Sequence, residues 1–160
     1  MPFTGTLASF TAGHDPTAVE LATWHDALLA LSDVWSSYVP TWTGGSPVIG
    51  NGTLAGAYVQ VGKFIVFRIN MVAGSTTTFG SGAWTLGLPV ASNVATGQAI
   101  GKASLNDSSV TTNRSGRTAW TNGVSSIALA DESTTRVGSA TPFTWANGDQ
   151  FTVTGIYEAS

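Results

Sequence analysis

The most constraining feature of this sequence is a row of large apolar residues at alternating spacings of three and four, within the only segment typical of a long helix. The six residues of this row are Leu21, Trp24, Leu28, Leu31, Trp35 and Tyr38. This spacing is the a/d pattern of a coiled-coil seam, in which apolar side chains pack between those of a neighbouring helix. It predicts a helix that associates with copies of itself.

Local signals predict where this helix begins and ends. Thr17 and Glu20 have the spacing of a capping box, in which each side chain binds the backbone N–H of the other residue. Pro40 disfavours helix at the residue that precedes it. We therefore predict a helix over residues 17–39.

A second interpretation of the same pattern stays open. Periods of 3.5 and 3.6 residues diverge by only about 20° per heptad, so an amphipathic helix lying on its own domain also fits so short a row. The two tryptophans and the tyrosine favour a wide interface, because large rings are awkward in a tight dimer. Association of three helices in a homotrimer is our leading interpretation.

The residues before the helix predict a separate segment. Residues 1–16 are polar and contain glycine, with Phe3, Leu7 and Phe10 as isolated apolar side chains. So short a segment cannot bury a core of its own. We predict an extended N-terminal arm whose three apolar residues dock on another surface.

The apolar pattern changes to period two in residues 40–160. The clearest signal is a hairpin, in which predicted strands 54–61 and 64–72 flank the two-residue turn Gly62-Lys63. The last predicted strand, 150–157, has one apolar face and should complete a core. Further strands are predicted at 76–79, 83–88, 98–105, 108–112, 118–120, 124–129, 134–137 and 143–145. The sequence thus predicts a mainly β head domain, a jelly-roll-like antiparallel β-sandwich.

Composition limits the partners of the chain. Charged residues make up 9% of it, against roughly 25% in ordinary soluble domains, and the formal net charge is −3. A negative chain lacks the attraction to phosphates on which nucleic-acid binding depends, so we expect no nucleic-acid partner. No run of about eighteen apolar residues occurs, so we expect no membrane partner either.

Residue patterns for catalysis are missing from the sequence. It contains no cysteine, no G-x-S-x-G elbow, no H-E-x-x-H pair and no Walker or dinucleotide motif. Asp131 and Glu132 are neighbours in a predicted loop, where a surface turn is favoured over the flanking carboxylates of a glycosidase. A calcium site that used them with Asp149 would lack ligands. We predict no enzyme activity, catalytic residue, metal or cofactor.

Six tryptophans form the strongest remaining signal. Buried tryptophans fill a core that is poor in leucine and isoleucine, and we favour core or subunit packing for them. Exposed tryptophans instead stack on sugar rings, so an outward Trp120 or Trp145 is the alternative, with a host-surface glycan as ligand.

A resemblance to a known group of proteins is carried by several segments of the chain, namely 12–13, 17–21, 27–35, 37–44, 49–56, 74–80, 142–149 and 155–158. These segments resemble structural proteins of bacteriophages that infect actinobacteria. The resemblance implies a trimeric virion protein whose N-terminal arm and helix attach to the particle, with β-sandwich heads facing outward. Such proteins occur as capsid decoration or head-fibre proteins and as minor tail or fibre-tip proteins.

The residues and the resemblance together give a leading hypothesis. We expect a non-enzymatic trimeric capsid decoration protein that is synthesised in the host cytoplasm and lies on the capsid surface. Its partners would be two further copies and the major capsid protein, since a tail fibre usually carries a longer shaft. The alternative is a minor tail or fibre-tip protein, held by a tail protein, that binds host glycan.

Overall fold

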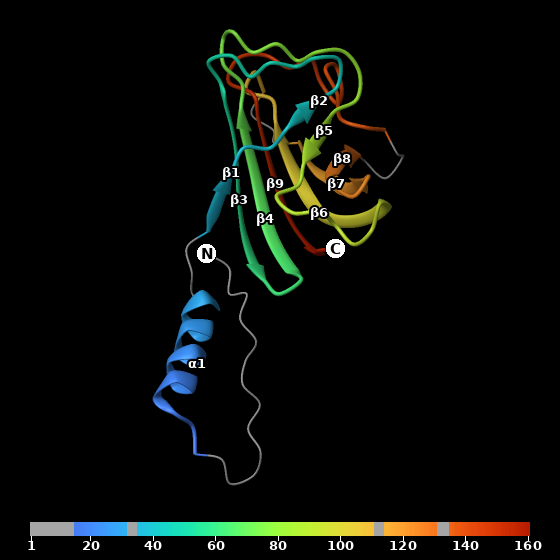
Figure 1. The fold of residues 1–160 in the computed structure, drawn as a ribbon. Coiled ribbons are helices and arrows are strands. Elements are labelled where there is room, and N and C mark those ends of the chain that lie inside the picture. Colours follow the sequence, from blue (N-terminus) through green and yellow to red (C-terminus); the bar gives the residue numbers. More distant parts are fainter. Residues whose placement is uncertain (1–14, 32–34, 111–113, 131–134) are drawn as a thin grey trace.

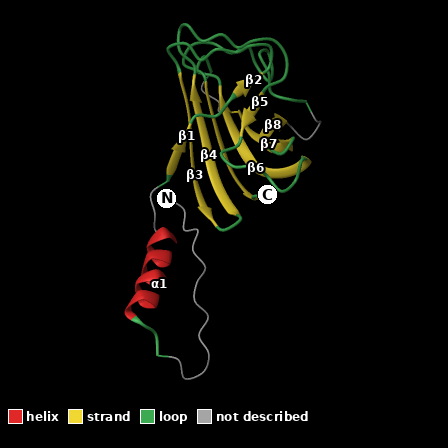
Figure 2. Ribbon diagram, in the orientation of Figure 1, coloured by secondary structure: helices red, strands yellow, loops and turns green. Residues whose placement is uncertain are grey.

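The structure is a computed structural model that describes residues 15–31, 35–110, 114–130 and 135–160. The described residues form one helix and nine strands (Figures 1 and 2). The helix is α1 (Ala18–Leu31). The strands are β1 (Ser36–Tyr38), β2 (Trp42–Thr43), β3 (Thr53–Val61), β4 (Phe64–Val72), β5 (Thr85–Gly87), β6 (Thr96–Asn106), β7 (Arg114–Asn122), β8 (Ser126–Ala130) and β9 (Gln150–Glu158).

All nine strands belong to one antiparallel sheet with the order β1-β3-β4-β9-β6-β7-β8-β5-β2. Its edge strands β1 and β2 are joined by residues 39–41 alone. A flat sheet of this width would hold its edges about 38 Å apart, whereas so short a connection spans at most about 14 Å. The sheet therefore curls until its two edges approach each other, as Figure 1 shows.

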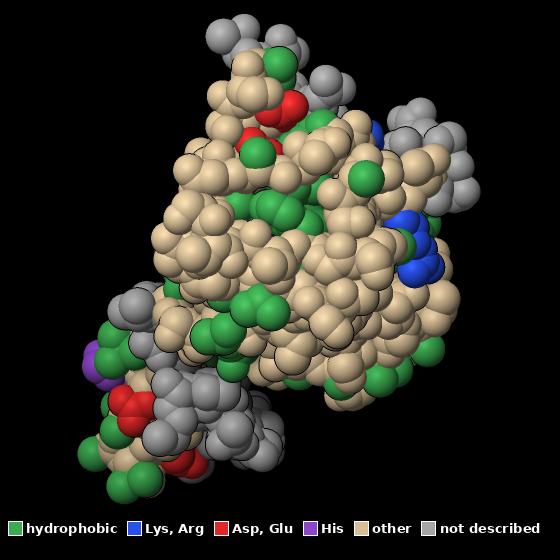
Figure 3. Space-filling view, turned by 90° about the horizontal axis from the view of Figure 1, so that it is seen from above, with side chains coloured by type: hydrophobic (Ala, Val, Ile, Leu, Met, Phe, Trp, Pro, Cys, Tyr) green, Lys and Arg blue, Asp and Glu red, His purple; other side chains and the backbone are tan. Residues whose placement is uncertain are grey.

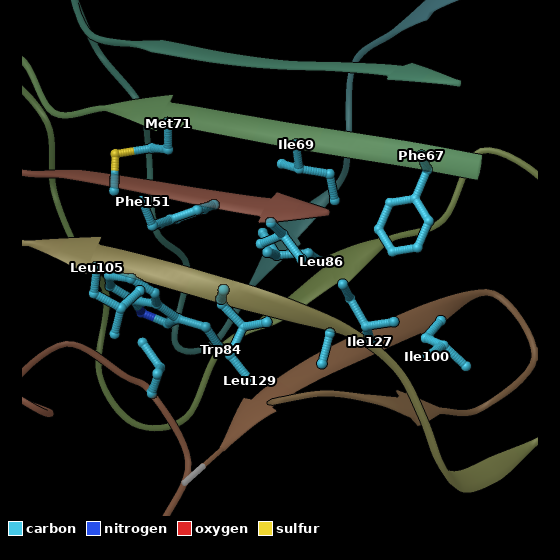
Figure 4. Packing of buried hydrophobic residues seen from close by; sticks show 14 of the residues in the cluster. Phe67, Ile69, Met71, Trp84, Leu86, Ile100, Leu105, Ile127, Leu129 and Phe151 are labelled. Carbon is cyan, nitrogen blue, oxygen red and sulfur yellow. The ribbon is translucent and has the colours of Figure 1, made fainter. Parts of the chain in front are cut away.

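The hydrophobic core fills the concave side of this curled sheet. On β4, alternate residues Ile65, Phe67, Ile69 and Met71 are buried, as the period-two pattern requires. Figure 4 shows them meeting side chains from β6, β8 and β9 across the interior. The predictions of a mainly β fold and of one short helix are confirmed. A jelly roll divides its strands between two sheets, whereas here one sheet curls around the core.

The predicted hairpin is confirmed. β3 and β4 pair antiparallel over their full lengths, from Thr53 opposite Val72 to Val61 opposite Phe64. The turn between them is Gly62-Lys63, and Gly62 adopts a φ of 59°, a left-handed conformation that glycine tolerates. A local turn signal and a local hydrophobic pattern agree here, which is why the prediction succeeds.

The predicted helix is too long. It ends at Leu31, and residues 36–38 form β1 instead of two further helical turns. Tyr38 pairs with Gly56 of β3, and its ring lies 5.9 Å from that of Tyr58. A Cβ atom at Gly56 would clash with the Tyr38 ring, so the glycine leaves the space that the ring occupies. This contact with a distant strand outweighs the helical period.

Predicted strands 98–105 and 118–120 lie within the longer strands β6 and β7, whereas others are shorter than predicted or do not form. Segments 76–79 and 143–145 contribute at most isolated bridges to the sheet. Residues 108–110 form a turn, and the rest of that predicted strand lies outside the described residues. β9 lies between β4 and β6, so the last predicted strand is a central one.

Candidate functional site

The first part of the candidate site is the start of α1, which is fixed by its capping box. The Thr17 backbone N–H donates to a Glu20 carboxylate oxygen at 2.8 Å, and the Glu20 backbone N–H donates to Thr17 Oγ1 at 3.3 Å. These bonds satisfy backbone groups that the first turn of a helix leaves open. The predicted capping box is confirmed, and it sets which residues α1 presents on each side.

The predicted seam begins on α1, where its first two residues are exposed. Leu21 is 55% exposed and Trp24 is 38% exposed, and the helical backbone continues through positions 28 and 31. Four of the six predicted seam positions therefore lie on α1. Figure 1 shows the helix below the β-sheet, beyond the turn between β3 and β4, rather than on the sheet. Large apolar side chains that are exposed, as Leu21 and Trp24 are, are typical of an interaction site.

The other two predicted seam residues do not lie on the helix. Trp35 precedes β1, and the Arg68 guanidinium carbon of β4 lies 5.1 Å from the centre of its ring. Tyr38 turns toward the core against Tyr58. The prediction of one continuous six-residue helical seam is wrong, because Trp35 and Tyr38 contact residues of the sheet instead of continuing the helix.

The two tryptophans of the glycan hypothesis have different environments. Trp145 is only 4% exposed, and its Nε1–H donates to the Gly138 carbonyl oxygen at 3.0 Å. Its ring packs among those of Trp84, Phe143 and Phe151. Trp145 therefore packs in the core, as the favoured prediction has it, and the glycan alternative is wrong for this residue.

Trp120, in contrast, is 37% exposed on β7, where its neighbour Ala119 is buried. Its ring lies on the outer side of the sheet. A separate groove of about 180 Å³ is lined by Ser104, Asn106, Gln150, Phe151 and Thr152. Uncharged amide and hydroxyl groups of this kind can bind sugar hydroxyls.

Sites for chemistry are sparse in the described part of the chain. It holds no group of three or more histidine, cysteine, aspartate or glutamate residues that could bind a metal ion. The Asp149 carboxylate is fully buried and accepts hydrogen bonds from Ser108 and Ala146.

The one helix in the described ranges, α1, is not long and apolar enough to cross a membrane. Phe3, Leu7, Phe10, Asp131 and Glu132 lie outside the described residues.

The two ends of the sheet differ in character. Long connections gather at the end away from α1 (Figure 1). Figure 3, which looks down on that end, shows mostly uncharged polar side chains and backbone, with a group of hydrophobic side chains near the middle and few charges. The helix and the turn between β3 and β4 lie at the opposite end.

An apolar group on the outer face of the sheet was missed by the sequence analysis. The residues are Trp35, Val59, Val61, Phe64, Val66 and Ile156, which we call the outer-face ladder. The signal lies in the first half of β4, where Phe64 and Val66 are apolar as well as the buried Ile65 and Phe67. A period-two pattern assigned an apolar face only to the core side.

The chain was compared with known proteins at the level of family, sequence and structure. No protein-family model matches it, and neither a curated protein nor a solved structure is found to be similar to it.

Proposed function

We propose that this chain is a non-enzymatic structural protein of a bacteriophage virion, and that it works as a trimer that decorates the capsid. In this proposal α1 and the residues before it hold the protein on the major capsid protein. The curled sheet is the head, and its long loops face outward.

The observation that carries the proposal is the exposed apolar row of α1. Leu21 and Trp24 stand three residues apart and are both exposed to solvent in the single chain. A helix of 14 residues is marginally stable alone in water. Burying its apolar side chains between copies would stabilise both the helix and the assembly.

The arrangement of the molecule supports attachment through one end. The helix lies at one end of the sheet, and the long loops lie at the other (Figure 1). A protein held through its helical end would present these loops away from the particle. The resemblance to phage structural proteins described above supports the same orientation.

Sedimentation tests the assembly part of the proposal, and α1 offers a matched pair of variants. Leu21→Lys places a charge in the apolar row, whereas Val19→Lys places the same charge on the opposite side of the helix, where Val19 is 75% exposed. We expect Leu21→Lys to dissociate the trimer and Val19→Lys to leave it intact. Equal behaviour of the two variants would contradict the role of this row.

Deletion of residues 1–14 tests particle attachment. We expect the deleted protein to remain trimeric and to lose binding to phage particles that lack it. Binding equal to that of the full chain would contradict an attachment role for Phe3, Leu7 and Phe10.

The alternative function is a minor tail or fibre-tip protein that binds host glycan. The exposed ring of Trp120 is the observation that favours it, since such rings stack on sugars. Glycan-array binding that is lost in Trp120→Ala without loss of fold would favour this alternative. Absence of glycan binding by the folded protein would remove it.

A further inference from the structure

We propose that the outer-face ladder, which lies near the C-terminal end of α1, is a contact surface for a second copy of this chain. This inference rests on the proposed function, because it names where the copies touch beyond their helices. It extends the interface from the helix to the sheet.

The ladder is continuous across three strands. Val59 of β3 lies opposite Val66 of β4, and Val66 lies opposite Ile156 of β9. Cross-strand neighbours have Cβ atoms roughly 5 Å apart, so these side chains form one apolar row. Val61 and Phe64, also opposite each other, extend the row to the turn of the hairpin.

The ladder ends sharply along the same strands. Toward the other end of β4 the outward residues are Arg68, Asn70 and Val72, and those of β9 are Thr154 and Thr152. Only Val72 among these five is apolar. The apolar part of the outer face is thus confined to the end nearest α1.

Exposed apolar residues concentrate at this end of the molecule. Fourteen large hydrophobic residues in the described ranges are exposed, and eight of them belong to α1 or the ladder. Those eight are Val19, Leu21, Trp24, Leu29, Trp35, Val61, Phe64 and Ile156. Patches of this kind mark interaction sites in soluble proteins.

The exposed apolar area indicates that α1 and the outer-face ladder form one interface together. Val19 lies on the opposite side of α1, so seven of these residues can share one interface. If each contributes on the order of 90 Å², they present on the order of 630 Å² per copy, against the roughly 800 Å² per partner of a standard stable interface. The three that lie on α1 supply less than half of this area. A helix of 14 residues therefore needs a further surface to hold copies together.

The short distance between α1 and the outer-face ladder indicates that a second copy of the chain covers both surfaces. Trp35 belongs to the ladder and follows Leu31, the last residue of α1, by four positions, so the two surfaces are at most about 14 Å apart. A neighbour whose helix packs along this α1 brings its own ladder to the same place. The rim carries charges of both signs, with Lys63 at the hairpin turn, Arg68 beside Trp35 and Glu158 opposite Phe64, which suits contact between identical surfaces.

The test is a pair of double variants on β4 and β9. Phe64→Lys with Ile156→Lys places two charges in the ladder, where each residue is 52% exposed. Val72→Lys with Gln150→Lys places the same charges on the same two strands and the same face, but at the opposite end. Sedimentation over a concentration series gives the trimer dissociation constant, and thermal unfolding monitored by tryptophan fluorescence checks the fold.

We expect the ladder variant to weaken association by about 100-fold or more, since two charged side chains replace large apolar ones in the contact, and we expect the control to assemble like the wild type. Wild-type association in the ladder variant, with Leu21→Lys still dissociating, would overturn this inference and leave the proposed trimer standing. Loss of particle binding in a fully trimeric ladder variant would overturn it too, since the ladder would then face the particle. A wild-type protein that is monomeric would overturn both proposals.

Discussion

Asp149 shows how one buried carboxylate joins separate segments of this fold. Its Oδ1 accepts hydrogen bonds from the backbone N–H and the hydroxyl of Ser108, both at 2.8 Å, and its Oδ2 accepts one from the Ala146 backbone N–H at 2.7 Å. Its own carbonyl accepts from Ala73, which follows β4. The residue thus ties the β6–β7 connection to the start of β9 and the end of β4.

Replacing Asp149 should therefore be costly. Asp149→Ala removes the acceptor of three hydrogen bonds and empties the space of a fully buried side chain, and we expect a loss of about 3 kcal/mol in the free energy of unfolding. Asp107→Ala is the control, because Asp107 accepts from Ser109 within its own exposed turn, and it should cost about 1 kcal/mol or less. Urea denaturation measures both, and equal losses would contradict the joining role of Asp149.

Tyr157 makes the stability of the fold sensitive to alkaline pH. Burial raises the pKa of its phenol to about 12, a rise that Tyr58 adds to and that a hydrogen bond with the Val90 backbone opposes. The unfolded chain loses this proton near pH 10, so between about pH 10 and 12 the folded state binds more protons than the unfolded state. The contribution of Tyr157 is complete below pH 10 and is lost as pH rises toward 12.

The variant Tyr157→Phe should flatten this decline. We expect the difference in unfolding free energy between pH 9 and pH 11.5 to be smaller in the variant than in the wild type, measured by urea denaturation at both values. Part of the decline should remain, because burial also raises the pKa of Tyr38. An unchanged decline would mean that the Tyr157 phenol is not the group that titrates.

At the scale of single elements, α1 depends on its capping box. Thr17→Ala removes the side chain that accepts the Glu20 backbone N–H, and loss of such a cap costs about 1 kcal/mol. Thr23→Ala is the matched control, since Thr23 Oγ1 donates to the Val19 carbonyl within the helix and alanine is the better helix former there. Far-ultraviolet circular dichroism should show less helix in Thr17→Ala and no less in Thr23→Ala. More helix in Thr17→Ala than in Thr23→Ala would contradict the stabilising role of the capping box.

Elements that depend on neighbouring residues were the ones predicted well from the sequence. The capping box and the β3–β4 hairpin rest on residues a few positions apart, and both have the predicted bonds. The end of the helix was missed because Tyr38 is held by Gly56 and Tyr58, about twenty residues away. No pattern within residues 17–39 contains that information.

The candidate site was predicted in part for the same reason. The spacing of Leu21 and Trp24 lies within α1 and was visible in the sequence, whereas the outer-face ladder exists only once β3, β4 and β9 are side by side. Core packing of Trp145 was favoured, but the glycan alternative stayed open, because the packing that buries this residue is tertiary and involves Trp84 and Phe151. A residue's exposure depends on the topology of the sheet, which local periodicity does not specify.

At the scale of the whole molecule, the curled sheet depends on its last strand. β9 pairs with β4 on one side and β6 on the other, and it supplies Phe151, Val153 and Tyr157 to the core. We expect a chain that stops at residue 149 to lose cooperative thermal unfolding, since a central strand and its buried side chains are gone. Deletion of residues 1–14 is the control and should keep the unfolding transition. Cooperative unfolding of the shortened chain would contradict the central role of β9.

The account as a whole depends on association through the helical end. Sedimentation equilibrium of the intact protein at micromolar concentration is the most direct test of this claim. Three copies of 16.4 kDa give about 49 kDa, and we expect that mass for the wild type. A single species of 16.4 kDa would contradict the account.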